Sequence, residues 1–157
     1  MAGIESLIAG SDKLTTVFGY WPSFHDAEVL ELHFVRGNVQ PQKGIYDFPL
    51  LTLRIHVWEL TRDIDSAGYL ILKHHTLVTL RFRDISDFQM QGFNHQNALM
   101  ELAVTAQERT EGPSPYFAVE LVAAFGMGAS FKCLGMEVLD AIPCTSEGIP
   151  QKPLDNQ

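Results

Sequence analysis

Several features that would indicate a particular class of protein are scarce in this chain. It has only two cysteines, Cys133 and Cys144, which is too few for a disulfide framework. No window approaches the roughly 18 apolar residues of a membrane-spanning helix, and the first residues lack the basic and apolar stretches of a signal peptide. The sequence therefore predicts a cytoplasmic protein with reduced thiols and no membrane partner, and it leaves a single disulfide between Cys133 and Cys144 open as the alternative.

Positive charge is scarce as well. The 157 residues include 11 Lys and Arg against 19 Asp and Glu, so the formal net charge is −8. Binding to nucleic acid without sequence preference depends on Lys and Arg that displace counterions from phosphates, so this balance argues against a nucleic-acid partner. Two interpretations stay open: a basic protein partner, or an acidic surface that only keeps the chain soluble.

The spacings typical of known catalytic sites are missing. The six histidines do not have the spacing of a zinc site, and there is no serine nucleophile motif. His25 and Asp26 open an expected strand, in which neighbouring side chains point to opposite faces, so one metal ion could not easily bind both. A metal-dependent hydrolase built on this pair would require a bound metal. We expect no metal, no cofactor and no catalytic residues.

The composition indicates one packed domain. The hydrophobic fraction is 46%, with ten phenylalanines. A chain of this length buries about two-thirds of the surface that it exposes when unfolded. Pro143 and the residues after it include three prolines and little apolar periodicity. We therefore predict a single β-rich domain over residues 1–143 and a flexible C-terminal tail over residues 144–157.

Alternation of apolar and polar residues predicts most of the secondary structure. Residues 3–18 suit a short helix that Gly10-Ser11 interrupts. Ser11 or Asp12 would cap a second turn that runs to Phe18, and Gly19 would end it. Residues 99–108 fit either a strand, which we favour, or a helix, and residues 110–115 suit a hairpin loop. The segments with the alternation of half-buried strands are 30–35, 51–58, 78–83, 117–125, 130–133 and 136–142, with 69–72 as a possible short strand.

These elements predict an α+β fold. It is mostly an antiparallel β-sheet, curved or sandwich-like, with an N-terminal helical segment. The outermost strand of such a sheet can pair with a second copy, so a homodimer is compatible with the sequence. Cys133 falls within an apolar alternating segment, which is typical of an inert core thiol.

Two polar and aromatic clusters are candidates for partner contacts. Residues 18–29 contain four aromatics, a proline and the His–Asp pair, which suits either a recognition surface or the lid of a core. Residues 94–97 place two Asn, one Gln and one His together, which suits hydrogen bonds to a partner or to an irregular backbone. In the structural interpretation, Asp26 accepts backbone N–H groups and His25 fixes the loop. The candidate contacts are Tyr20, Trp21, Phe24, His25, Asp26, Asn94, His95 and Asn97.

A third candidate is one face of the expected sheet. If the first three strands are adjacent, their polar positions share a face and gather basic side chains. The functional interpretation is a carboxylate or phosphate site, in an anion-binding β-barrel or an enzyme. The structural interpretation is ion pairing with Glu31 and Glu120. The residues of this face are His33, Arg54, His56, Trp58, Arg81 and Arg83.

The segment Trp21-Pro22-Ser23-Phe24-His25-Asp26 resembles a motif of the immunity protein 50 family. Residues 92–97 are also similar to that family, as is the ending from Phe131 to Pro143. The resemblance spans about residues 17–143. It implies a non-enzymatic inhibitor that is encoded beside a polymorphic toxin of bacteria, binds the cognate toxin domain and occludes its active site. Tyr20, Trp21 and Trp58 would be reasonable anchors for such a partner.

Overall fold

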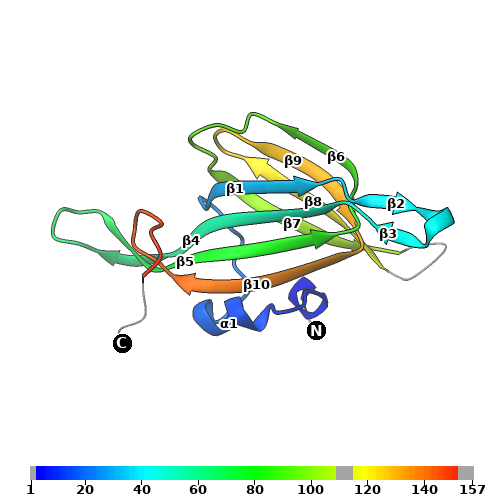
Figure 1. Ribbon diagram of the computed structural model, residues 1–157. Coiled ribbons are helices and arrows are strands. Elements are labelled where there is room, and N and C mark those ends of the chain that lie inside the picture. The colour runs from blue at the N-terminus through cyan, green and yellow to red at the C-terminus, as the bar shows by residue number, and fades with distance from the viewer. Residues whose placement is uncertain (1–2, 109–114, 152–157) are drawn as a thin grey trace, which may run out of the picture.

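Two antiparallel four-stranded sheets face each other in the computed structural model, which describes residues 3–108 and 115–151 (Figure 1). The strand order is β1-β4-β5-β10 in the first sheet and β6-β9-β8-β7 in the second, and β2 and β3 form a separate hairpin. The strands are β1 (Glu28–Val35), β2 (Asn38–Gln40), β3 (Ile45–Asp47), β4 (Leu50–Ile64), β5 (Leu70–Arg83), β6 (Ser86–Gln91), β7 (Leu99–Gln107), β8 (Tyr116–Ala123), β9 (Gly128–Cys133) and β10 (Gly135–Pro143). The α+β, sandwich-like prediction agrees with this architecture.

The N-terminal segment is a 3₁₀ turn, η1 (Ile4–Leu7), followed by a short helix, α1 (Asp12–Phe18). The predicted interruption lies at Gly10, whose φ is 74° and where a Cβ would collide with the carbonyl of Val138. Ser11 occupies the N-cap position, but its side chain makes no capping hydrogen bond. Gly19 ends the helix in the left-handed conformation, as predicted. Figure 1 shows α1 beside β10.

The strand interpretation of residues 99–108 is confirmed, because β7 pairs in register with β8. Residues 69–72 do not form a separate strand, since β5 begins at Leu70 and continues to Arg83. Sequence reasoning missed β6, in which only Phe88 packs on the core and the other side chains are exposed. It also missed the hairpin of β2 and β3, which a second 3₁₀ turn, η2 (Pro41–Lys43), connects. Of the expected loop at 110–115, residues 110–114 lie outside the described residues.

Aromatic rings join the two sheets. The ring centroid of Phe131 on β9 lies 5.0 Å from that of Phe82 on β5 and 5.8 Å from that of Phe88 on β6. Phe88 in turn packs edge-on against Phe34 on β1, at 4.4 Å. Cys133 lies in the same core, and burial raises the pKa of its thiol to about 12. The thiol therefore stays protonated, in agreement with an inert core cysteine.

The first residues of the segment predicted as a tail fold back on the first sheet. The Cys144 N–H donates to the carbonyl of His75 at 3.1 Å, and the Gln151 N–H donates to the carbonyl of Pro143 at 3.0 Å. Cys144 is buried by this turn, and both cysteines are free. Residues 152–157 of that segment lie outside the described residues.

Strands β4 and β5 form a hairpin in the first sheet and are 15 and 14 residues long. Only β5 residues from 76 onward pair with β10, so within residues 3–108 and 115–151 no further strand flanks the far half of the hairpin. In Figure 1 this half projects well past the other strands. We call residues 59–73 the arm.

Phe131→Ala tests the aromatic contact between the sheets. It removes a ring that is almost fully buried, so we expect the free energy of unfolding to fall by about 3–5 kcal/mol in a urea titration. Phe125→Ala is the matched control, because 63% of that side chain is exposed, and it should change stability by less than about 0.5 kcal/mol. Equal effects of the two substitutions would contradict the proposed packing.

Candidate partner-binding site

The two clusters that the sequence singled out lie side by side. The Asp26 N–H donates to the carbonyl of Leu99 at 2.8 Å, and the Leu99 N–H donates to the carbonyl of Ala27 at 2.9 Å. Farther along, the Leu102 N–H donates to the carbonyl of Ser23 at 3.1 Å. Residues 23–29 thus connect β1, at the edge of the first sheet, with the start of β7, at the edge of the second.

Asn97 is the polar centre of this connection. Its side chain is only 2% exposed, and its Oδ1 accepts the N–H groups of Asn94 at 2.9 Å and Met127 at 3.2 Å. Its Nδ2 donates to the carbonyls of Asn94 at 2.7 Å and Val29 at 3.2 Å. The Asn97 N–H donates to the Glu28 carboxylate. All four hydrogen-bonding positions of the buried amide are therefore satisfied.

The aromatic motif is anchored in the core by Phe24. This side chain is 1% exposed, and its ring lies 5.8 Å from that of Trp21 in an edge-on contact. Phe24 and Asp26 have φ values of 66° and 67°, the left-handed region that bulky residues rarely adopt. Such backbone strain persists only where surrounding packing enforces it. The buried ring of Phe24 supplies that packing and turns His25 and Asp26 outward.

The roles predicted for His25 and Asp26 are only partly observed. His25 Nδ1 lies 2.9 Å from the carbonyl of Met100, so the imidazole does hold the loop. Asp26 does not take the expected backbone N–H groups: its Oδ2 lies 3.6 Å from His25 Nε2 in an exposed contact. The carboxylate that accepts a backbone N–H belongs to Glu28, because the strained turn points Asp26 toward solvent.

Burial divides the eight candidate contacts into three groups. Phe24 and Asn97 are buried, so they position the segment and cannot touch a partner in the folded state. Trp21 is half-buried against the core. The exposed candidates are Tyr20, His25, Asp26, Asn94 and His95.

The aromatic motif also borders the base of the arm. Residues 20 and 22–26 line a hollow of about 180 Å³ together with residues 57–60 of β4. At its edge, the Tyr20 hydroxyl donates to Glu59 Oε2 at 3.3 Å, and Glu59 Oε1 lies 2.8 Å from His74 Nδ1. Burial, followed by the charge of Glu59, raises the pKa of Tyr20. The sequence did not indicate Glu59 or His74, because an irregularity after Val57 breaks the alternation there.

The basic face of the first sheet is assembled as predicted from three adjacent strands, β1, β4 and β5. Arg54 Nη1 lies 3.8 Å from Glu31, the partner that the sequence suggested. Arg81 contacts Glu137 on β10 through Nε at 3.0 Å and Nη2 at 2.7 Å. The expected partner Glu120 lies instead on β8 of the other sheet.

An anion would have to displace carboxylates at this face. Arg83 Nη1 also has an acidic neighbour, Asp84, at 3.9 Å, and the His33 side chain is exposed. Arg54 Nε has no hydrogen-bond partner among the described residues, but it is buried and so cannot be reached from solvent. The arginines of this face are therefore paired with carboxylates, as in a structural role, and do not form an open anion site.

Two histidines form an unusual pair on the same face. His56 is buried, and its Nε2 lies 3.0 Å from Nδ1 of His75, while the Trp58 ring packs 4.8 Å from the His56 ring. Burial first, and His75 second, lower the pKa of His56 to about 4. Burial also lowers the pKa of His75. Both rings are therefore neutral at pH 7, and they contribute no positive charge to the basic face.

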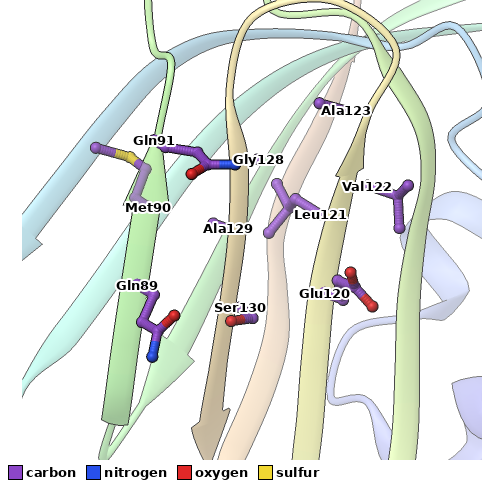
Figure 2. A pocket seen from close by; sticks show the side chains of 10 residues that line it. All are labelled: Gln89, Met90, Gln91, Glu120, Leu121, Val122, Ala123, Gly128, Ala129 and Ser130. Atoms are coloured by element: carbon purple, nitrogen blue, oxygen red, sulfur yellow. The ribbon is translucent and has the colours of Figure 1, made fainter.

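The outer face of the second sheet is hollowed. Figure 2 shows this hollow, of about 360 Å³, running across β6, β9 and β8. Small residues such as Gly128 and Ser130 form its floor, and the longer Gln89, Gln91 and Glu120 stand at its sides. It is shallow and polar, and it lacks the aromatic lining that is common in small-molecule sites.

Within 3–108 and 115–151, no group of three or more His, Cys, Asp or Glu side chains could hold a metal ion. No helix in that part of the chain is both long and apolar enough to cross a membrane.

These features define a β-rich α+β domain whose characteristic motifs join its two sheets. The profile of the Immunity protein 50 family matches residues 10–143, which is most of the chain. The chain belongs to this family, and the resemblance seen in the sequence is confirmed. No significant match was found among curated proteins or among solved structures.

Asn97→Asp tests the buried amide. The substitution keeps the shape but replaces two donors with an acceptor that faces two carbonyls, so we expect the free energy of unfolding to fall by about 2–4 kcal/mol. Asn38→Asp makes the same charge change at an exposed position whose Oδ1 only accepts a hydrogen bond. It should leave the urea midpoint almost unchanged, and a similar loss in both variants would refute a special role for Asn97.

The histidine pair predicts a pH dependence. The folded-state pKa of His56 is below the ordinary 6.5, so the unfolded chain binds more protons and stability falls as the pH drops from about 6.5 toward 4. The free energy of unfolding that is lost through protonation of His56 over this pH range is up to about 3 kcal/mol. Carboxylates also titrate in this range, so the test compares the wild type with His56→Gln. Unfolding of the variant should depend less on pH between 7 and 4, and parallel curves would contradict the assignment.

Proposed function

We propose that this protein is an immunity protein that binds a cognate bacterial toxin domain and neutralises it by covering the active site. It acts as a binding protein without catalysing a reaction. Membership in the Immunity protein 50 family is the observation that carries this proposal. The family description implies protection, and protection by a small domain is most directly achieved by occlusion of the toxin.

The charge of the chain supports a protein partner of opposite sign. The net charge is −8, which accelerates the encounter with a basic domain such as one that acts on nucleic acid. The arginines of the first sheet do little to repel a basic partner, because Arg54 and Arg81 are paired with Glu31 and Glu137. We place this activity in the cytoplasm, which agrees with two free, buried thiols.

The packing of the domain supports binding without rearrangement. The family motif is fixed by the buried Phe24 and by backbone hydrogen bonds to β7, and the adjoining polar cluster is fixed by Asn97. A surface that is already ordered loses little conformational entropy on association.

Co-expression tests the proposal. The toxin domain encoded beside this gene is induced in a bacterial host with or without this protein, and survival is counted. We expect this protein to restore growth and to form a stoichiometric complex with a catalytically inactive toxin domain in size-exclusion chromatography. An unrelated immunity protein expressed at the same level is the control. Absence of both protection and complex, with a folded protein, would refute the proposal.

A further inference from the structure

The arm carries six large apolar residues that are exposed to solvent. Ile64 is 64% exposed, Tyr69 72% and Leu70 48%. Isolated apolar side chains at a surface are common, but a contiguous group of them usually marks a contact site. The exposed apolar residues of the arm are Leu60, Ile64, Tyr69, Leu70, Ile71 and Leu72.

Four of these residues share one face of the arm. Leu60 lies opposite Leu72 and Ile64 lies opposite Leu70 in the pairing of β4 with β5. Partners directly opposite each other point to the same side, and Leu70 and Leu72 are two residues apart on one strand. The result is an apolar stripe along the arm. We call Leu60, Ile64, Leu70 and Leu72 the arm stripe.

The arm is held in shape although no third strand in the described part of the chain pairs with it. At its base, Glu59 contacts both His74 and the Tyr20 hydroxyl. In its middle, the Thr61 hydroxyl donates to the carbonyl of Ile71 at 2.6 Å. At its tip, Asp65 Oδ1 accepts the N–H groups of residues 67 and 69 at 2.9 and 3.0 Å. A two-stranded ribbon is marginal by itself, so these contacts preorganise a segment whose apolar side is exposed.

The form and charge of the arm indicate the kind of surface that receives it. It projects beyond both sheets, so it can enter a concave surface (Figure 1). Its end carries Asp63 and Asp65 beside a single cation, Arg62, on a chain of net charge −8. Lys73, near the base, lies opposite Glu59 in the register. The complement is a cleft with apolar walls and a positively charged floor, which is the active site expected of an enzyme that acts on an anionic substrate.

We propose that the arm inserts its apolar stripe into the positively charged active-site cleft of the cognate toxin domain. This inference rests on the proposed function and names the surface that performs it. The hollow that residues 20 and 22–26 form with the base of the arm continues the contact onto the family motif, where His25 and Asp26 are exposed. The second exposed apolar group, Val39, Tyr46 and Phe48 on the hairpin of β2 and β3, lies at the other end of the sandwich.

The double variant Ile64→Ser/Leu70→Ser tests the arm stripe. Both side chains are exposed, so the variant should keep the wild-type circular dichroism and melting temperature. We expect its Kd for the inactive toxin domain, measured by calorimetry, to rise at least about 100-fold, because a few residues in desolvated pockets near the centre of an interface carry most of the binding energy. Val39→Ser/Tyr46→Ser is the matched control at the opposite hairpin, and it should change Kd by less than about 3-fold.

The charge at the tip has a separate kinetic signature. Asp63→Lys should slow association with the toxin domain at low salt by about 10-fold, leave dissociation nearly unchanged and weaken the salt dependence of the association rate. Unchanged association would remove the electrostatic part of the inference. The arm stripe would then have to be judged on the double variant alone, through its Kd.

The outcomes separate this inference from the proposed function. If the wild type protects and Ile64→Ser/Leu70→Ser protects and binds equally well, the arm proposal is overturned while the immunity function stands. If the wild type neither binds nor protects, both fall. If sedimentation shows a wild-type homodimer that the double variant abolishes without loss of toxin binding, the stripe is a contact between two copies, and the proposal is also overturned.

Discussion

The hydrogen bonds of one buried amide hold the two sheets in their relative position. The Asn97 side chain joins the backbone of β1 at Val29, the connection before β7 at Asn94 and the turn before β9 at Met127. In this low-dielectric position each unmade bond would cost far more than a made one contributes, so the set is strongly specified. Gly126 is required beside it, because its φ is 78° and a Cβ would collide with the carbonyl of Gln96.

This arrangement explains why the family motif combines aromatic and polar residues. The buried Phe24 ring and the backbone bonds to β7 close one edge of the sandwich, and the closure forces left-handed backbone at Phe24 and Asp26. The same turn presents His25 and Asp26 next to the base of the arm. The primary role of the motif is therefore structural, because it connects the two sheets. This connection fixes the positions of its exposed residues.

The alternation of apolar and polar residues predicted strands correctly wherever a strand has one buried and one exposed face. The central part of β4, with Leu51, Leu53 and Ile55 inward, and the regular β8 both show strict alternation. It failed for β6, where a register irregularity leaves only Phe88 on the core. It also failed past Val57, where another irregularity begins the arm and brings Glu59 to His74. Irregular pairing is decided by the neighbouring strand, which a local pattern does not contain.

The sequence by itself determined the β-rich class, the interrupted N-terminal helix and the family, and it favoured a strand over a helix at residues 99–108. Each follows from short-range periodicity, from glycine positions or from a contiguous motif. Only the tertiary structure decided that Arg81 pairs with Glu137 and not Glu120, that Phe24 and Asn97 are buried, and that β4 and β5 extend into a free arm with an apolar stripe. The physical reason is that these features depend on which distant strands become neighbours, and strand order in a sheet is settled by the packing of the whole core.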